Sequence, residues 1–406
     1  MRVVFLSPSY PPEMIEYTRG LTEVGAEVYG VGDTPASGLP PSVQSRLSDY
    51  LQVSGIMNEE HVVSSVKTWL KGRRIDRIEA LWEPLVLTAA RLREEMGIPG
   101  MSHDTVLGFR DKQLMKERVA KAGLRVPHSR RILSEADAWD GAQAIGYPLI
   151  LKPIAGAGSA DTYRCNDPHE LKRALDLTRH IPQASMEEFI EGEEFTLDTV
   201  CVDGEPKYIN ICQYLPRPLI ARTNEWISPV VVTLRDLDQP KLRDGIRLGL
   251  GVLKALQMGT GFTHMEWHRK QDGEVVFGEI GCRPGGAHIV DQMNYTSDID
   301  LFREWARAAC WKHFASSTER KYNVAIIFKR AEGQGIIRHI QGLEDFKRRF
   351  GSWICSEQLL PVGTPRRNWK HTLLSDGFLI VRHPGLEEAL HMANIAASEI
   401  RMYAGA

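Results

Sequence analysis

Thr263–Gly286, with the sequence THMEWHRKQDGEVVFGEIGCRPGG, contains two extended runs joined by a tight turn. Phe262–Trp267 is the first run, Val275–Ile280 is the second, and Gln271–Gly273 has the composition of the turn between them. The sequence therefore predicts an antiparallel hairpin, and the rest of the chain can be interpreted around it.

Two acidic side chains of this hairpin are expected to converge. Side chains alternate along a strand, so His264 and Glu266 share one face of the first run, and Glu279 can meet Glu266 across the ladder. Arg283 follows the second run, beside a Pro-Gly-Gly turn that leaves room for a ligand. Paired carboxylates with a nearby guanidinium predict a site for a divalent metal and phosphate, and the alternative is a hairpin with charges on its solvated face.

The composition is that of an ordinary globular protein. The chain has 406 residues, 43% of them hydrophobic, and its 50 Lys and Arg nearly balance its 52 Asp and Glu. This length suggests two to four packed units, and the charge balance argues against nucleic acid or an anionic membrane as partner. No apolar run reaches about 18 residues, the minimum for a spanning helix. Six scattered cysteines without a C-x-x-C pair are typical of reduced thiols in a cytoplasmic protein.

The first hundred residues alternate between strand and helix patterns. The expected strands are Arg2–Leu6, Ala26–Val31, Leu47–Val53 and Ile78–Trp82, and the expected helices cover residues 13–24, 59–71 and 84–96. This alternation predicts a doubly wound parallel sheet. The opening segment also resembles the start of a two-domain glycosyltransferase, but the second half of the chain offers no matching sugar-nucleotide sheet.

A strong helix is expected at KQLMKERVAKAG, between Asp111 and Gly123, and Asp104 is expected to cap a short turn before it. Lys112 lies in the first turn of this helix. The helix macrodipole disfavours a cation there unless an anion lies nearby. Lys112 is therefore either an anion-binding residue or an ordinary surface lysine.

A second lysine ends a buried strand. From His128 the pattern is strand, helix over residues 134–145, and the strand YPLILKP, which ends at Lys152. The glycine-rich segment IAGAGSAD follows, and its successive N–H groups can surround phosphate oxygens. It is not a P-loop, because the lysine precedes the glycines and no helix follows directly.

Acidic residues then accompany two further strands. Glu187 lies in the strand Ala184–Ile190, and Glu194 and Asp198 lie in EGEEFTLDTVCV. Residues 215–230 are irregular, with three prolines and two arginines, which is typical of either a substrate-facing loop or an ordinary surface loop. Residues 240–257 predict an amphipathic helix that leads into the hairpin.

The last part of the chain, about residues 320–406, predicts a small α+β unit. Its expected elements are strands at 323–328 and 377–382 and helices at 343–350 and 385–402, after a helix at 301–313. It carries no evident reactive cluster, so we interpret it as structural, either closing over the site or forming an interface.

Together, the order and spacing of these motifs resemble the ATP-grasp superfamily of carboxylate–amine ligases, over most of the chain. The resemblance implies a fold of α/β and α+β parts, in which ATP lies between two α+β units. The units expected are an N-terminal α/β domain (1–103), a subdomain with a glycine-rich lid (104–190), a subdomain with the metal and catalytic residues (191–318), and a C-terminal subdomain (319–406).

The resemblance also implies residue roles. Those for the nucleotide fall on Lys112 and Lys152 (phosphates), Gly156, Gly158 and Ser159 (lid), Glu187, Glu188 and Ile190 (adenine), and Glu194 (ribose). Glu266 and Glu279 match the magnesium-binding acids, Arg283 matches the arginine that stabilises the reacting oxygens, and His264 is a further catalytic candidate. Where many members carry Asn, this chain has Gly281, which puts the coordination of a second magnesium in doubt.

The implied activity is ATP-dependent activation of a carboxylate as an acyl phosphate, followed by coupling to an amine. His264 before the metal acid and the EIGCRPGG segment resemble the amino-acid ligases that form dipeptides. The alternatives are a bicarbonate-activating carboxylase, a purine-type ligase, and a nucleotide-binding protein without activity. The cofactors would be ATP and Mg²⁺, with Mn²⁺ as a substitute, and the partners would be a small carboxylate, a small amine and a second copy in a homodimer.

Overall fold

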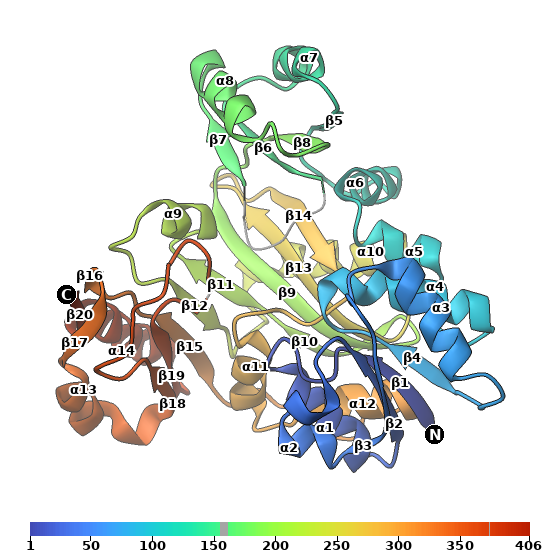
Figure 1. Cartoon of the computed structure of the whole chain (residues 1–406). Helices are drawn as coiled ribbons and strands as arrows, with labels where there is room; N and C mark the ends of the chain where they lie inside the picture. Colours follow the sequence, from blue (N-terminus) through green and yellow to red (C-terminus); the bar gives the residue numbers. More distant parts are fainter. Residues whose placement is uncertain (155–160, 373) are drawn as a thin grey trace.

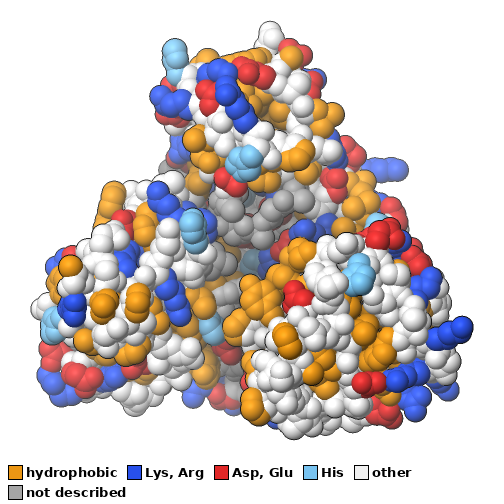
Figure 2. All heavy atoms as spheres, viewed as in Figure 1, with side chains coloured by type: hydrophobic (Ala, Val, Ile, Leu, Met, Phe, Trp, Pro, Cys, Tyr) orange, Lys and Arg blue, Asp and Glu red, His pale blue; other side chains and the backbone are white. Residues whose placement is uncertain are grey.

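The computed structural model describes residues 1–154, 161–372 and 374–406. Three lobes surround a central sheet (Figure 1): an N-terminal unit at the lower right, a small sheet at the top, and the C-terminal residues at the lower left. The surface is hollowed between these lobes (Figure 2). Within the described residues, no helix has both the length and the apolar character that crossing a membrane requires.

The N-terminal unit is the expected parallel sheet, with strand order β3-β2-β1-β4. Its strands are β1 (Arg2–Leu6), β2 (Glu27–Gly32), β3 (Leu47–Gln52) and β4 (Arg77–Glu79). Its helices are α1 (Met14–Glu23), α2 (Pro41–Gln44), α3 (Glu59–Trp69) and α4 (Val86–Met96), with short 3-10 turns at Ala36–Gly38 and Glu83–Leu85.

Two helices connect this unit to the small sheet. They are α5 (His103–Gly108) and α6 (Lys112–Lys121). Asp111 caps α6 as expected, since its carboxylate accepts from the N–H groups of Gln113 and Leu114. The expected cap by Asp104 is wrong: Ser102 caps α5, and the Asp104 carboxylate instead contacts Arg118. The serine hydroxyl lies one residue before the helix, where it can accept from Thr105 N–H.

The small sheet has the order β5-β8-β6-β7 and is antiparallel. Its elements are β5 (Ser129–Ile132), α7 (Glu135–Ile145), β6 (Leu149–Pro153), β7 (Tyr163–Cys165), α8 (Pro168–Leu177) and β8 (Ala184–Glu188). The glycine-rich segment lies between β6 and β7. Its expected lid residues, Gly156, Gly158 and Ser159, lie outside the described residues.

The central sheet has the order β14-β13-β9-β11-β12-β15-β19-β18, and β10 also pairs with β9. Its strands are β9 (Glu193–Val202), β10 (Glu205–Asn210), β11 (Cys212–Leu215), β12 (Val230–Thr233), β13 (Gly261–Arg269), β14 (Val275–Gly281), β15 (Asn323–Phe328), β18 (Ile354–Leu359) and β19 (Gly377–His383). The helices with it are α9 (Pro218–Thr223), α10 (Pro240–Ala255), α11 (Ile289–Ser297), α12 (Leu301–Trp311) and α14 (Leu386–Glu399).

Apolar cores form where helices cover this sheet. Trp267, Phe195 and Leu248 belong to one buried cluster that joins β9, β13 and α10, and Tyr17 and Trp305 belong to another that joins α1 to α12. Gly20 allows the α1–α12 contact, because a Cβ at this position would lie 2.5 Å from the carbonyl oxygen of Phe302. The N-terminal unit therefore packs against the helices that cover this sheet.

The C-terminal residues differ from the expected separate unit. β15, β19 and β18 extend the central sheet across the expected boundary at residue 318. Residues 401 and 402 were expected to end a helix but belong to β20 (Arg401–Gly405), which pairs with β16 (Glu332–Gly333) and β17 (Ile336–Gln341). The remaining elements are α13 (Leu343–Phe350) and a 3-10 turn at Gly351–Trp353.

Candidate functional site

The hairpin predicted within Thr263–Gly286 is β13–β14, and its register brings the two carboxylates together. Glu266 pairs directly with Glu279, and His264 pairs with Gly281. A bulge follows between Glu266 and Trp267, which changes the pairing beyond the two acids. Local alternation and the turn were sufficient to predict this arrangement.

Lysines from α6 and β6 approach these acids. Lys112 Nζ lies 2.8 Å from Glu279 Oε2, and Lys152 Nζ lies 3.6 Å from the same oxygen and 3.0 Å from Glu187 Oε2. Lys116, which sequence analysis did not single out, places Nζ 2.6 Å from Glu187 Oε1. Because Lys116 follows Lys112 by one helical turn, both lysines lie on the face of α6 that points into the site.

The neighbouring charges in this cluster shift the pKa values of its carboxyl and ammonium groups. Burial raises the pKa of the Glu187 carboxyl, but Lys116 and Lys152 outweigh burial and hold it at about 2. Burial also opposes ionisation of Glu279, yet Lys112 and Lys152 hold its pKa well below the usual value. For Lys116, burial lowers the ammonium pKa to about 8, partly offset by Glu187.

The two paired carboxyl groups therefore differ in pKa. Burial raises the pKa of Glu266 to about 7, with Glu279 and Glu194 acting in the same direction. Both carboxylates lie next to each other, but the lysines approach on the side of Glu279. A cation placed between the pair would therefore stabilise the ionised form of Glu266 more than that of Glu279, which the lysines already stabilise.

A small cavity of about 120 Å³ lies over this cluster. It is lined by most of the residues expected to bind a nucleotide: Lys112, Lys152, Glu187, Glu188, Ile190 and Glu194, together with Glu266 and Glu279. These residues come from α6, the small sheet and the central sheet. The sequence motifs therefore converge on one place, between two structural units.

Arg217 lines the small cavity and contacts two of the residues expected to bind a nucleotide. Its Nε lies 3.0 Å from Glu194 Oε2, and its Nη1 donates to the carbonyl oxygen of Ile190 at 2.9 Å. Burial raises the pKa of Glu194 although Arg217 opposes the shift. Glu188 points elsewhere, since both its carboxylate oxygens accept from Arg125 Nη2, at 2.9 and 3.0 Å.

A large cavity of about 490 Å³ lies beside the small one. Glu266 and Glu279 line both cavities, so the two spaces meet at the carboxylate pair. His264 and Arg283 line the large cavity only, among the expected site residues. Its wall also includes residues from distant parts of the chain that sequence analysis did not assign: Trp82, Glu83, Arg110, Tyr214, Arg330 and Trp369.

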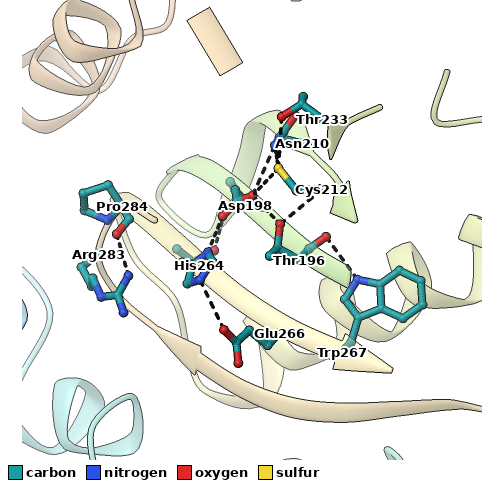
Figure 3. A network of polar contacts seen from close by, with 12 residues as sticks. Thr196, Asp198, Asn210, Cys212, Thr233, His264, Glu266, Trp267, Arg283 and Pro284 are labelled. Carbon is teal, nitrogen blue, oxygen red and sulfur yellow. Dashed lines mark hydrogen bonds and ion pairs between the residues drawn. The ribbon is translucent and has the colours of Figure 1, made fainter. Parts of the chain in front are cut away.

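His264 is held in a buried polar network (Figure 3). Its Nδ1 lies 2.6 Å from Asp198 Oδ1, and its Nε2 lies 3.8 Å from Glu266 Oε1. Asp198 is itself fixed, since its Oδ2 accepts from Thr196 Oγ1 at 2.7 Å and from Asn210 Nδ2 at 3.2 Å. The ring of His264 therefore lies between a fixed carboxylate and one of the paired acids.

Arg283 is oriented by the N-terminal unit. Its Nε donates to Glu83 Oε2 at 2.8 Å, and its Nη1 donates to the carbonyl oxygen of Pro284 at 2.8 Å. Glu83 also contacts Arg110. Burial lowers the pKa of the Arg283 guanidinium, but Glu83 and Glu279 raise it, so the group stays charged.

The donor set suits magnesium bound together with phosphate. Among the described residues, no group of three or more His, Cys, Asp or Glu side chains could enclose a metal by itself. Magnesium is usually held by one or two carboxylates, with phosphate oxygens and water completing its shell. Glu266 and Glu279 are the carboxylates that fit this pattern, with lysines nearby to hold the phosphates.

Comparison with known proteins agrees with this geometry. Residues 145–291 match the model of the ATP-grasp domain. The chain is 28% identical over 240 residues to an L-arginine-specific L-amino acid ligase of Bacillus subtilis, an alignment that covers 57% of each protein. The chain thus spans little more than half the length of this relative.

Solved structures with the same fold align over nearly the whole chain. The crystal structure of an L-amino acid ligase from Bacillus licheniformis has a TM-score of 0.80 at 19% identity, and covers 100% of this chain and 99% of that one. The biotin carboxylase domain dimer of Hydrogenobacter thermophilus 2-oxoglutarate carboxylase, in complex with MgADP, ADP and bicarbonate, has a TM-score of 0.70 at 19% identity, and covers 99% and 91%. The fold is that of ATP-grasp proteins, and the glycosyltransferase alternative has no support.

Proposed function

From the premise that this chain is an ATP-grasp protein, we propose that it is an ADP-forming carbon–nitrogen ligase. It would activate a carboxylate, that of an amino acid by its family likeness, and couple it to an amine. The observation that carries the proposal is the meeting of the two cavities at Glu266 and Glu279. A small polar cavity and a larger, partly apolar one on either side of a carboxylate pair suit transfer of a phosphoryl group between two bound molecules.

The small cavity would hold ATP. Lys112 and Lys152 would bind its phosphates, Glu194 its ribose, and Glu187, the Glu188 backbone and Ile190 its adenine. Gly156, Gly158 and Ser159 keep their proposed role as a lid over the phosphates. Glu188 can act only through its backbone here, because Arg125 engages its carboxylate.

Glu266 and Glu279 would hold Mg²⁺, or Mn²⁺ in its place. The bound ion would supply neutralisation of the phosphate charge and alignment of the phosphates. The protein supplies the rest of the positive charge through Lys112, Lys152 and Arg283. Phosphoryl transfer depends mainly on such positioning and charge compensation.

The reaction would proceed in two steps. A carboxylate oxygen of the first substrate attacks the γ-phosphorus of ATP, the bond from this phosphorus to the β–γ bridging oxygen breaks, and ADP leaves. The amine nitrogen then attacks the acyl carbon, and phosphate departs with the electrons of the C–O bond. The nitrogen loses a proton, and His264 can accept it at Nε2 while Asp198 stabilises the ring through Nδ1.

The remaining proposals concern organisation. We retain the division into residues 1–103, 104–190, 191–318 and 319–406 as functional units, although the central sheet crosses the last boundary. Six unpaired cysteines support a cytoplasmic location. A homodimer is supported by analogy with the Hydrogenobacter thermophilus domain, which is a dimer.

A phosphate-release screen tests the proposed function. The protein is incubated with ATP, Mg²⁺ and pairs of amino acids, with bicarbonate as a separate arm and Glu279→Gln as the inactive control. We expect ADP and phosphate only when a carboxylate and an amine are both present. Release of AMP and pyrophosphate would contradict acyl-phosphate chemistry, and stimulation by bicarbonate alone would favour the carboxylase alternative.

A further inference from the structure

We propose that the far end of the large cavity binds a second substrate carboxylate, distinct from the one that is activated, through Arg222 and Arg330. The proposal rests on the proposed function, because it assigns a substrate group to the cavity next to the carboxylate pair. It predicts a preference for substrates that carry a second carboxylate, which neither the fold nor the pair of Glu266 and Glu279 implies. Both arginines line the large cavity.

Arg330 is held rigidly at the end of β15. Its Nη1 donates to the carbonyl oxygens of Ala221 and Asn224, at 2.8 and 2.9 Å, and its Nε donates to Ser375 Oγ at 3.3 Å. Its Cζ lies 4.6 Å from the ring centroid of Trp369. A planar guanidinium fixed on several sides loses little freedom when it binds an anion through its remaining N–H groups.

Arg222 lies beside it on α9. Its Nη2 donates to the carbonyl oxygen of Lys370 at 2.9 Å, so both arginines contact the segment Trp369–Lys370. Figure 1 shows α9 on the side of the molecule where the C-terminal residues lie. The two guanidiniums are therefore neighbours, although they come from positions 108 residues apart (330 − 222).

Neither arginine forms an ion pair with a carboxylate in residues 1–154, 161–372 and 374–406. The carboxylates that act on Arg330 electrostatically, Glu225 and Asp376, are engaged by Arg366, at 2.8 and 4.0 Å. Burial, reinforced by Arg222, lowers the pKa of Arg330 to about 10. Two adjacent cations without a counter-ion are unfavourable, so an anion placed between them is stabilised.

The other two arginines of the cavity provide a contrast. Arg110 and Arg283 both contact Glu83, so one shared carboxylate compensates part of their charge. Within the described residues, the large cavity thus has one pair of arginines that shares a carboxylate near the reacting end and one pair without a carboxylate partner at the other end. Of the two pairs, the second offers the stronger binding to a further carboxylate.

The two ends are separated by enough space for different substrate groups. In the sheet, β9, β11 and β12 lie between Glu266 on β13 and Arg330 after β15, which is four strand spacings or roughly 19 Å between backbones along the sheet. Apolar side chains, including Val231 and Phe328, line the space between. A substrate carboxylate at the arginines is therefore separated from the activated one by an apolar section.

Two substrate groups have this chemistry. One is the free α-carboxylate of an amino acid that acts as the amine, and the other is an acidic side chain on the activated amino acid. Both would present a carboxylate to the same arginines. Replacing each group by its amide, which removes the charge and keeps the shape, separates the two sources.

The first experiment measures binding without turnover. In the presence of MgADP, calorimetric titrations compare L-alanine with L-alaninamide and L-glutamate with L-glutamine. We expect the carboxylate of at least one pair to bind about tenfold more tightly than its amide, as charge-assisted hydrogen bonds require. Equal affinity within both pairs would overturn the proposal, even if the protein proves to be a ligase.

The second experiment uses variants. Arg222→Gln should abolish that preference, and Arg338→Gln, which alters an arginine outside the cavity that donates to the Ala406 carbonyl, should keep it. Arg330→Gln provides a second test, with its melting temperature measured because its backbone contacts support the fold. If Arg222→Gln and Arg330→Gln weaken the binding of the acid and of its amide equally, the arginines do not bind the carboxylate.

The turnover screen separates this proposal from the function on which it rests. A protein that releases ADP with amides and acids alike is a ligase without the second carboxylate site. A protein that binds acids through the two arginines but forms no ADP with any amine has the site, and the proposed function is then wrong.

Discussion

Glu266 and Glu279 stand directly opposite each other in the β13–β14 ladder, and both line the two cavities of the site. Like charges opposite each other are unfavourable unless a cation is shared between them. The lysines approach the Glu279 side, and Glu266 has the raised pKa. This asymmetry would make the proposed magnesium shell around the pair sensitive to any added oxygen ligand.

Gly281, two residues after Glu279, is the position at which to add one. Its backbone does not require positive φ, and a Cβ there would lie 3.3 Å from Arg283 Cγ, which a small movement of the arginine relieves. We expect Gly281→Asn to lower the Mg²⁺ concentration for half-maximal activity by about threefold or more, since an amide oxygen replaces a water. The measurement is a Mg²⁺ titration at saturating ATP. Gly281→Ala is the matched control, and an equal shift in both variants would assign the effect to the position of Arg283.

Arg283 is expected to act on the reacting phosphoryl group. Arg283→Lys keeps the charge but loses the planar fork, so kcat/KM should fall by a factor equivalent to roughly 2–3 kcal/mol. Glu83→Gln, which removes the carboxylate that orients Arg283, should cost less because the guanidinium remains. Steady-state kinetics with both substrates provides the comparison. A larger loss in Glu83→Gln than in Arg283→Lys would show that the ion pair acts mainly on the fold.

Local patterns predicted the parts of this site that lie within one element or one hairpin. Alternation and a turn were enough for the pairing of Glu266 with Glu279, whereas the helix start alone left Lys112 open between an anion-binding residue and a surface lysine. Glu83 and Trp369 could not be predicted in this way. They reach the cavity only because the N-terminal unit packs on α12 and the C-terminal strands extend the central sheet, and neither contact leaves a periodic signal in the sequence.

The same reason explains the errors at the C-terminus. The pattern over residues 385–402 is helical up to Glu399, but Arg401–Gly405 pairs with β17. This short strand lies between β16 and β17 and is stabilised by pairing with both neighbours rather than by its own residues, so its own sequence does not predict it. Likewise, Arg330 belongs to a segment that was interpreted as structural, and its position in the cavity follows from β15 pairing with β12.

Asp198 is expected to control His264. In Asp198→Asn the amide oxygen would accept from Thr196 Oγ1 and Asn210 Nδ2, which both donate to the carboxylate. The amide NH2 group would then face His264 Nδ1, so His264 loses its carboxylate acceptor. We expect kcat to fall by about 10- to 100-fold with the KM for ATP changed less than about twofold. Thr196→Val, which removes one donor and keeps the carboxylate, is the control. A parallel rise in the KM for ATP would indicate a general disturbance of the sheet.

The last prediction concerns stability and pH through Lys329. This lysine is buried, and its Nζ donates to Ser228 Oγ and to the carbonyl oxygens of Ala396 and Ala397, at 3.0, 3.0 and 2.7 Å. Burial lowers its pKa from 10.5 to about 8. Below pH 8 both the folded and the unfolded state carry the proton, so the full cost of the buried charge is present. As the pH rises above 8 the folded state loses the proton first, the unfolded state binds more protons, and the free energy of unfolding rises.

Lys329→Met removes this dependence. We expect the unfolding free energy of the wild type, minus that of the variant, to increase by about 2–3 kcal/mol between pH 7 and pH 10, measured by urea denaturation. Other titrating groups, including Lys116, are common to both proteins and cancel in the difference. Lys321→Met is the matched control, because Lys321 is an exposed lysine paired with Asp298 at 3.1 Å. A difference that stays constant with pH would mean that Lys329 keeps its proton in the folded protein, held by the three oxygens around it.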